Sequence, residues 1–78
     1  MAETFPTEVT PNEAGYGFGV EEAPTGKRVV VARLTSGLRA LKVQRSDGTI
    51  EYVITDDKLQ PLYTVAKSIE ELRSRFPR

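Results

Sequence analysis

Residues 38–55 read LRALKVQRSDGTIEYVIT, and this stretch decides the expected fold. Asp47-Gly48 lies between two runs of alternating apolar and polar residues, which is among the strongest short-range signals for a β-hairpin. A two-residue turn at this dipeptide predicts that Val43 lies opposite Tyr52 on the neighbouring strand. We therefore predict two antiparallel strands, one on each side of this turn.

A third strand is expected just before this hairpin, over residues 27–34. Its three consecutive valines, residues 29–31, favour a strand that is buried to some degree on both faces. A second tight turn at Ser36-Gly37 predicts that Val30 lies opposite Val43. The two turns then agree on one apolar face of a β-meander. Its members are Val30, Ala32, Leu41, Val43, Ile50, Tyr52 and Ile54.

The remaining C-terminal residues predict a short strand and one helix. Residues 62–66 can add a fourth strand, and residues 68–71 (SIEE) match a capping box at a helix start. Apolar residues then recur at helical spacing until Pro77 ends the helix. The predicted fold class is α+β, a small antiparallel β-meander of three or four strands with one C-terminal helix and a disordered acidic N-terminal arm.

The expected arm comprises residues 1–26, and the body comprises residues 27–78. The arm contains five glutamates and no Lys or Arg, a net charge of −5, whereas the body contains all 11 basic and six acidic residues, a net charge of +5. Pro and Gly interrupt every helical or strand period in the arm, so we expect most of it to be flexible. Residues 16–20 are the exception, because their apolar side chains can dock on the body.

Length and composition restrict the function classes. A chain of 78 residues forms one domain with a thin core, which favours a partner or a second copy. There is no Cys or His, so we expect no disulfide, no usual zinc site and no cofactor. The apolar runs are too short to cross a bilayer, and residues 1–6 (MAETFP) lack a signal-peptide layout. We expect a cytoplasmic protein without a membrane partner.

Residues 14–20 (AGYGFGV) are the closest approach to a functional motif. Over these seven residues the chain resembles the aromatic strand motif of RNA-recognition domains and the Gly-Phe-Gly-Phe strand of cold-shock domains. The resemblance implies that Tyr16 and Phe18 stack on bases. The match departs from those families at Ala14, where a basic residue is expected, and at the adjacent Glu21, which repels phosphates. A hinge or a locally docked segment is the other interpretation.

Arginines border the predicted meander. In the expected register Arg28 lies opposite Arg45, and Arg39 lies close to the same apolar face. Facing like charges disfavour strand pairing unless an acidic group joins them. That group can be the chain's own acidic arm, a partner's carboxylates or phosphate. Alternatively, the arginines are solvated edge residues that keep the sheet from adding strands.

These patterns predict a small non-catalytic protein–protein interaction module, a regulator or accessory subunit, which binds a protein partner or self-associates. The candidate partner-binding residues are Arg28, Arg39, Arg45, Val29, Val31, Val53, Tyr16 and Phe18. The alternative is a nucleic-acid-binding protein that uses the basic body and is autoinhibited by its acidic arm. We expect no enzyme, because the serines have no His to activate them, and no metal site, because the carboxylates lack the spacing of a calcium loop.

Overall fold

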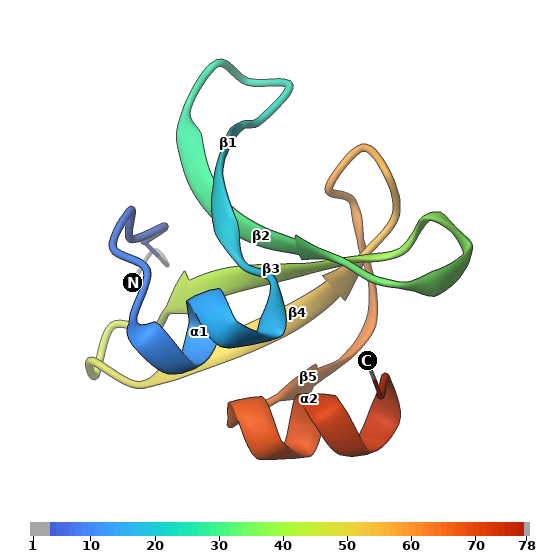
Figure 1. Ribbon diagram of the computed structural model, residues 1–78. Helices are drawn as coiled ribbons and strands as arrows, with labels where there is room; N and C mark the ends of the chain where they lie inside the picture. Colours follow the sequence, from blue (N-terminus) through green and yellow to red (C-terminus); the bar gives the residue numbers. More distant parts are fainter. Residues whose placement is uncertain (1–3, 78) are drawn as a thin grey trace.

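The computed structural model describes residues 4–77, and for residues 63–65 the backbone only. Within this range the chain forms one five-stranded antiparallel sheet, whose strand order follows the chain, and two α-helices (Figure 1). The strands are β1 (Gly19–Glu22), β2 (Arg28–Arg33), β3 (Arg39–Gln44), β4 (Ile50–Thr55) and β5 (Pro61–Ala66), and the helices are α1 (Pro11–Tyr16) and α2 (Ile69–Arg75). The predicted α+β class, with an antiparallel meander and a C-terminal helix, is confirmed.

The N-terminal segment contains α1 and β1, which the sequence analysis did not predict. Thr10 caps α1: its hydroxyl accepts from the amide of Glu13 at 3.3 Å, and the Glu13 carboxylate accepts from the amide of Thr10 at 2.9 Å. Pro11 occupies the first helical position, where a missing amide hydrogen costs little. β1 then pairs with β2 along its whole length, so the sheet has a fifth strand beyond the three or four that were predicted.

The predicted register between β3 and β4 is wrong by one residue. Lys42 lies opposite Tyr52, whereas Val43 lies opposite Glu51. The cause is a turn of three residues, 46–48, which is closed by a 2.8 Å hydrogen bond from the amide of Arg45 to the carbonyl of Thr49. Of these three residues only Gly48 has a positive φ, at 90°, so the two-residue type I′ turn does not form.

The turn between β2 and β3 is also one residue longer than predicted. Ser36 and Gly37 do make the reversal, with φ of 59° and 79°. The amide of Leu34 nevertheless bonds to the carbonyl of Leu38, which leaves three residues (35–37, η1) in the loop. A shift of one residue moves each side chain to the other face of the sheet. The single apolar face of seven residues is therefore incorrect, and Val43 and Tyr52 point to opposite sides.

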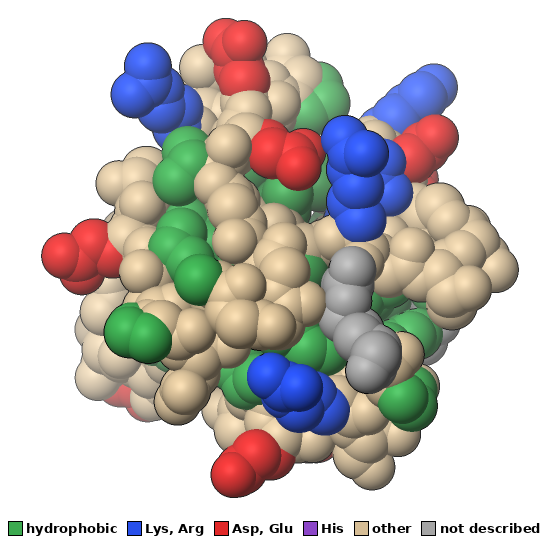
Figure 2. Space-filling model, viewed as in Figure 1, with side chains coloured by type: hydrophobic (Ala, Val, Ile, Leu, Met, Phe, Trp, Pro, Cys, Tyr) green, Lys and Arg blue, Asp and Glu red, His purple; other side chains and the backbone are tan. Residues whose placement is uncertain are grey.

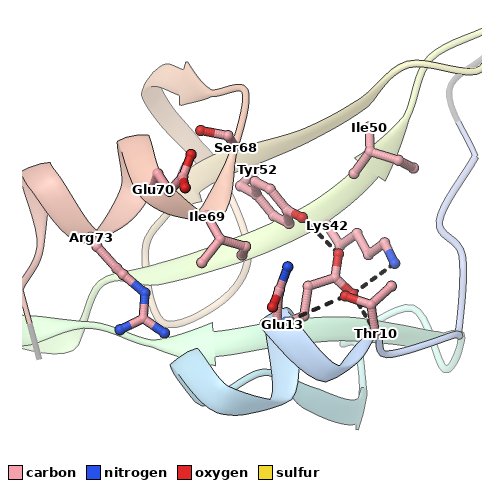
Figure 3. A pocket seen from close by; sticks show the side chains of 10 residues that line it. Thr10, Glu13, Lys42, Ile50, Tyr52, Ser68, Ile69, Glu70 and Arg73 are labelled. Atoms are coloured by element: carbon pink, nitrogen blue, oxygen red, sulfur yellow. Dashed lines mark hydrogen bonds and ion pairs between the residues drawn. The ribbon is translucent and has the colours of Figure 1, made fainter.

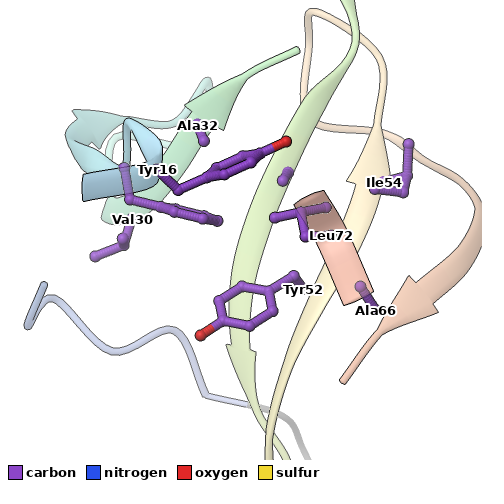
Figure 4. Packing of buried hydrophobic residues seen from close by; sticks show 9 residues of the cluster. Tyr16, Val30, Ala32, Tyr52, Ile54, Ala66 and Leu72 are labelled. Atoms are coloured by element: carbon purple, nitrogen blue, oxygen red, sulfur yellow. The ribbon is translucent and has the colours of Figure 1, made fainter. Parts of the chain in front are cut away.

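The sheet instead has a core on each face. The first core lies under the two helices (Figure 4) and consists of Tyr16, Phe18, Val30, Ala32, Ala40, Tyr52, Ile54, Ala66 and Leu72. The second core, on the opposite face, consists of Val29, Val31, Leu41 and Val43. β1 and β2 curve away from β3 and β4 (Figure 1), and Ala23 and Leu59, from two turns, pack against the second core. Turns close this second core, whereas helices close the first.

The C-terminal region agrees with the sequence analysis. β5 is the predicted fourth strand and pairs with β4, and Leu72 of α2 is fully buried. The Ser68 hydroxyl accepts from the amide of Glu71 at 3.0 Å, as the capping box predicts. The Glu71 carboxylate accepts from the amide of Lys67 rather than from that of Ser68. Helix α2 is thus fixed at its start and by its apolar face.

Candidate functional site

The two aromatics of the glycine-rich segment are core residues. Tyr16 is 2% exposed and Phe18 is 6% exposed, and both lie in the first core. The Tyr16 hydroxyl donates to the carbonyl of Phe76 at 2.6 Å, and the ring of Phe18 lies 5.2 Å from that of Tyr52. Neither ring has a face open to a base, so the base-stacking role is wrong for this fold. The docked-segment interpretation fits instead.

The predicted apolar binding strip is also absent. Val29 and Val31 are buried in the second core, and Val53 is half-buried against it. The sequence analysis lists these three valines as candidate partner-binding residues, and two-residue turns would place them on the face opposite Val30 and Tyr52. With three-residue turns and a bent sheet, they become interior residues.

The three candidate arginines do not form one border. Arg28 lies opposite Glu22 of β1, not opposite Arg45. Arg45 pairs with Glu51 at 2.6 Å, and Arg39, at the other end of β3, donates to the carbonyl of Gly37. On the face shown in Figure 2, acidic and basic side chains are interspersed. The three arginines therefore lie in different parts of the sheet. Arg45 and Arg39 bond to groups of the same chain.

A polar cavity of about 530 Å³ lies between α1 and α2 over the sheet (Figure 3). The Glu13 carboxylate is at its base, 2.9 Å from the Lys42 ammonium and 2.6 Å from the Tyr52 hydroxyl. The ammonium of Lys42 also donates to the carbonyl of Glu8 at 2.9 Å. Figure 3 shows the Tyr52 and Lys42 side chains pointing toward this one carboxylate. The cluster fastens α1 and the segment before it to β3 and β4.

The electrostatics of this cluster do not suit proton transfer. Burial raises the pKa of Glu13, but hydrogen bonds from Tyr52, Thr10 and Lys42 outweigh it and hold that pKa below its ordinary value. Burial, together with the Glu13 carboxylate, raises the pKa of Tyr52 well above its usual range. Glu13 thus stays ionised and Tyr52 stays protonated at neutral pH. Neither shift brings a pKa toward neutral pH, where general acid–base catalysis is most efficient. Because the cluster joins α1 to β3 and β4, we call it the clamp.

An apolar groove of about 210 Å³ opens over the second core, between the β1–β2 turn and the β4–β5 turn. Two buried core residues, Val29 and Leu41, line it together with the half-buried Leu59. Phe5 lies along it with 40% of its surface exposed, a large fraction for a phenylalanine. The groove is the place where the second core meets solvent.

The turn that carries Leu59 repeats the design of the three other turns between neighbouring strands of the sheet. In each, three residues are enclosed by a hydrogen bond between the flanking residues, and the third residue is left-handed. This residue is Gly26 (φ 89°), Gly37 (φ 79°) or Gly48 (φ 90°) in three of the turns and Leu59 (φ 64°) in the fourth. A left-handed conformation costs a residue with a side chain about 1–2 kcal/mol. Leu59 therefore stands where glycine is the relaxed choice.

No protein-family model, curated protein or solved structure matches the chain. Among the described residues no group of three acidic side chains is placed to hold a metal ion. Neither helix in that range is long and apolar enough to cross a bilayer.

Sequence reasoning missed both the clamp and the groove. For the clamp a signal exists, because residues 10–13 (TPNE) are a capping box with proline at the first helical position. For the groove there is none, since Leu59 follows Asp-Asp-Lys in a segment with no glycine to indicate a left-handed residue. The groove forms only when two distant turns meet.

Proposed function

We propose that the protein is a small non-catalytic protein-binding module, a regulator or accessory subunit, that receives its partner at the apolar groove. The observation that carries this proposal is the groove itself, on the side of the sheet away from α1 and α2. There the exposed ring of Phe5 and the half-buried Leu59 line the same groove as the buried Val29 and Leu41. Accessible apolar surface of this kind is typical of interaction sites.

The polar cavity supports a non-catalytic role. At its base Glu13 bonds to Lys42 and Tyr52, and every fully buried side-chain nitrogen or oxygen of the described residues has a hydrogen-bond partner. Glu13 accepts hydrogen bonds from both Lys42 and Tyr52, which ties α1 to β3 and β4. We therefore assign the cavity to stability and the groove to binding.

The alternative of nucleic-acid binding has weaker support. Its proposed stacking residues, Tyr16 and Phe18, are buried. Acidic residues of the N-terminal segment also engage basic residues of the sheet, as in the pair between Glu21 and Arg33 at 3.9 Å. That arrangement lowers the positive potential available to phosphates.

Site-specific photo-crosslinking tests the proposal. A benzoylphenylalanine is placed at position 25, where the exposed Thr25 lines the groove, or at position 74, where the exposed Ser74 lies on α2. We expect irradiation of living source cells to give a discrete protein adduct from position 25 and none from position 74. Equal adduct patterns from both positions, or no protein adduct at all, would contradict the proposal.

A further inference from the structure

The charged side chains that line the groove, among the residues the structure describes, are both basic. Lys27 from the β1–β2 turn and Lys58 from the β4–β5 turn both line it, and both are exposed. Of residues 4–77, no Asp or Glu lines the groove, and in the same range neither lysine forms an ion pair. The nearby Asp56 carboxylate already accepts from the amides of Lys58 and Gln60, at 2.8 and 2.9 Å. The groove therefore favours an acidic occupant.

The backbone strain at Leu59 points to the same place. Glycine occupies the equivalent position of the three other turns, yet here a leucine is held left-handed. Its side chain packs against the second core and lines the groove. Glycine would adopt this conformation without strain. A leucine that keeps the strain marks a position at which the side chain itself is required.

The size of the groove limits what it can hold. Its volume of about 210 Å³ lies below the roughly 300–1,000 Å³ of typical small-molecule sites. Such a space accommodates one large apolar side chain rather than a cofactor. The occupant is thus a peptide side chain, and the two lysines at the groove determine what flanks it.

We propose that the groove binds a segment of a partner protein that inserts one bulky apolar side chain beside Leu59 and Phe5 and sets flanking carboxylates against Lys27 and Lys58. This inference rests on the proposed protein-binding function and adds the chemistry of the partner. Leu59 supplies apolar contact, and the lysines select the acidic flanks and speed association.

Selection from a random dodecapeptide display library on the immobilised full chain tests this chemistry. We expect enriched peptides to contain Leu, Ile, Met or Phe with Asp or Glu on at least one side. In fluorescence anisotropy, replacing the apolar residue of such a peptide by Ser, or its acidic residues by Lys, should weaken binding at least tenfold. Raising the salt concentration should weaken binding as well.

Matched variants of the protein locate the binding. Lys58→Glu should weaken binding of the enriched peptide at least tenfold. Lys67→Glu, at an exposed lysine away from the groove, should leave that binding unchanged. Leu59→Gly should weaken it similarly while circular dichroism shows an intact fold, and Leu62→Ser, on the exposed part of β5, should have no effect. If Leu59→Gly fails to fold, the double variant Lys27→Glu, Lys58→Glu decides.

The outcomes separate this inference from the proposed function. Peptides with neutral or basic flanks that still lose binding on Leu59→Gly would overturn the acidic partner and leave the protein-binding function standing. Selection of no peptide, together with no adduct from position 25, would overturn both. Self-association that Leu59→Gly abolishes in sedimentation equilibrium would make the occupant a second copy and would also overturn the inference.

Discussion

The two faces of the sheet are closed in different ways. On one face the helices cover an aromatic core, and a buried carboxylate links residues far apart in the chain: Glu13 lies 29 residues from Lys42 and 39 residues from Tyr52. On the other face, turns between neighbouring strands meet over four aliphatic residues and leave a groove. Polar contacts thus hold the chain together on the first face, while apolar surface stays accessible on the second. We therefore expect the first face to contribute most to stability, and the recognition that we propose would take place on the second.

Removing the buried carboxylate tests the first face most severely. Glu13→Ala leaves the buried ammonium of Lys42 and the Tyr52 hydroxyl without their partner, so we expect a loss of about 3–5 kcal/mol in the free energy of unfolding. Glu21→Ala is the control, because its pair with Arg33 is exposed and should contribute less than about 1 kcal/mol. Urea denaturation measures both, and equal losses would show that the clamp does not hold the fold.

Acidification should reproduce part of this loss. The folded pKa of Glu13 lies below its ordinary value, so its contribution to stability is complete above that ordinary value and disappears as the pH falls through the folded pKa. We expect the free energy of unfolding to fall between about pH 5 and pH 2, and to fall less in Glu13→Gln. Urea titrations at several pH values compare the two proteins. If the free energy of unfolding fell equally with pH in the wild type and in Glu13→Gln, another carboxylate would control the acid transition.

Removing one hydroxyl should have a smaller effect. Tyr52→Phe keeps the ring in the first core but deletes the 2.6 Å hydrogen bond to the Glu13 carboxylate. A hydrogen bond to a charged group contributes about 1.5–3 kcal/mol, so we expect a loss in that range. Combined with Glu13→Ala, this substitution should add almost nothing further, since the partner is already gone. Additive losses would show that Tyr52 acts independently of the clamp.

Much of the fold was predictable because its signals are local. The valine-rich strand, the reversal at Ser36-Gly37 and the capped helix after Ser68 all follow from neighbouring residues. The register between β3 and β4 was not predictable, because Asp47-Gly48 suits two turn types of different length. Here the Asp47 carboxylate accepts from the amide of Thr49 at 2.9 Å in a three-residue turn, and that single extra residue exchanges the faces.

The candidate site depended on contacts that no local pattern contains. Glu13 counted as one charge of a flexible acidic arm, and only the fold shows that it is buried against Lys42. The valines of β2 were correctly seen to suit burial on both faces, but their exposure depended on the register. The groove needs Lys27 and Lys58, 31 positions apart in the sequence, to come from turns that meet. Sequence patterns predict which residues form strands and helices. A site on a bent sheet also depends on how those strands and turns lie relative to one another in space.

The smallest expected effect compares two turns of the same design. Gly48→Ala places a side chain at a φ of 90° with no neighbour within 4 Å of the new carbon, so only the backbone responds, and we expect a loss of about 1–2 kcal/mol. Leu59→Gly relieves similar strain but loses the partial burial of a leucine, which contributes up to about 1.5–3 kcal/mol when complete. These terms nearly cancel, so Leu59→Gly should stay within about 1 kcal/mol of the wild type in urea denaturation. A loss of several kcal/mol would mean that Leu59 serves the second core rather than the groove, because a side chain retained for recognition has little effect on folding.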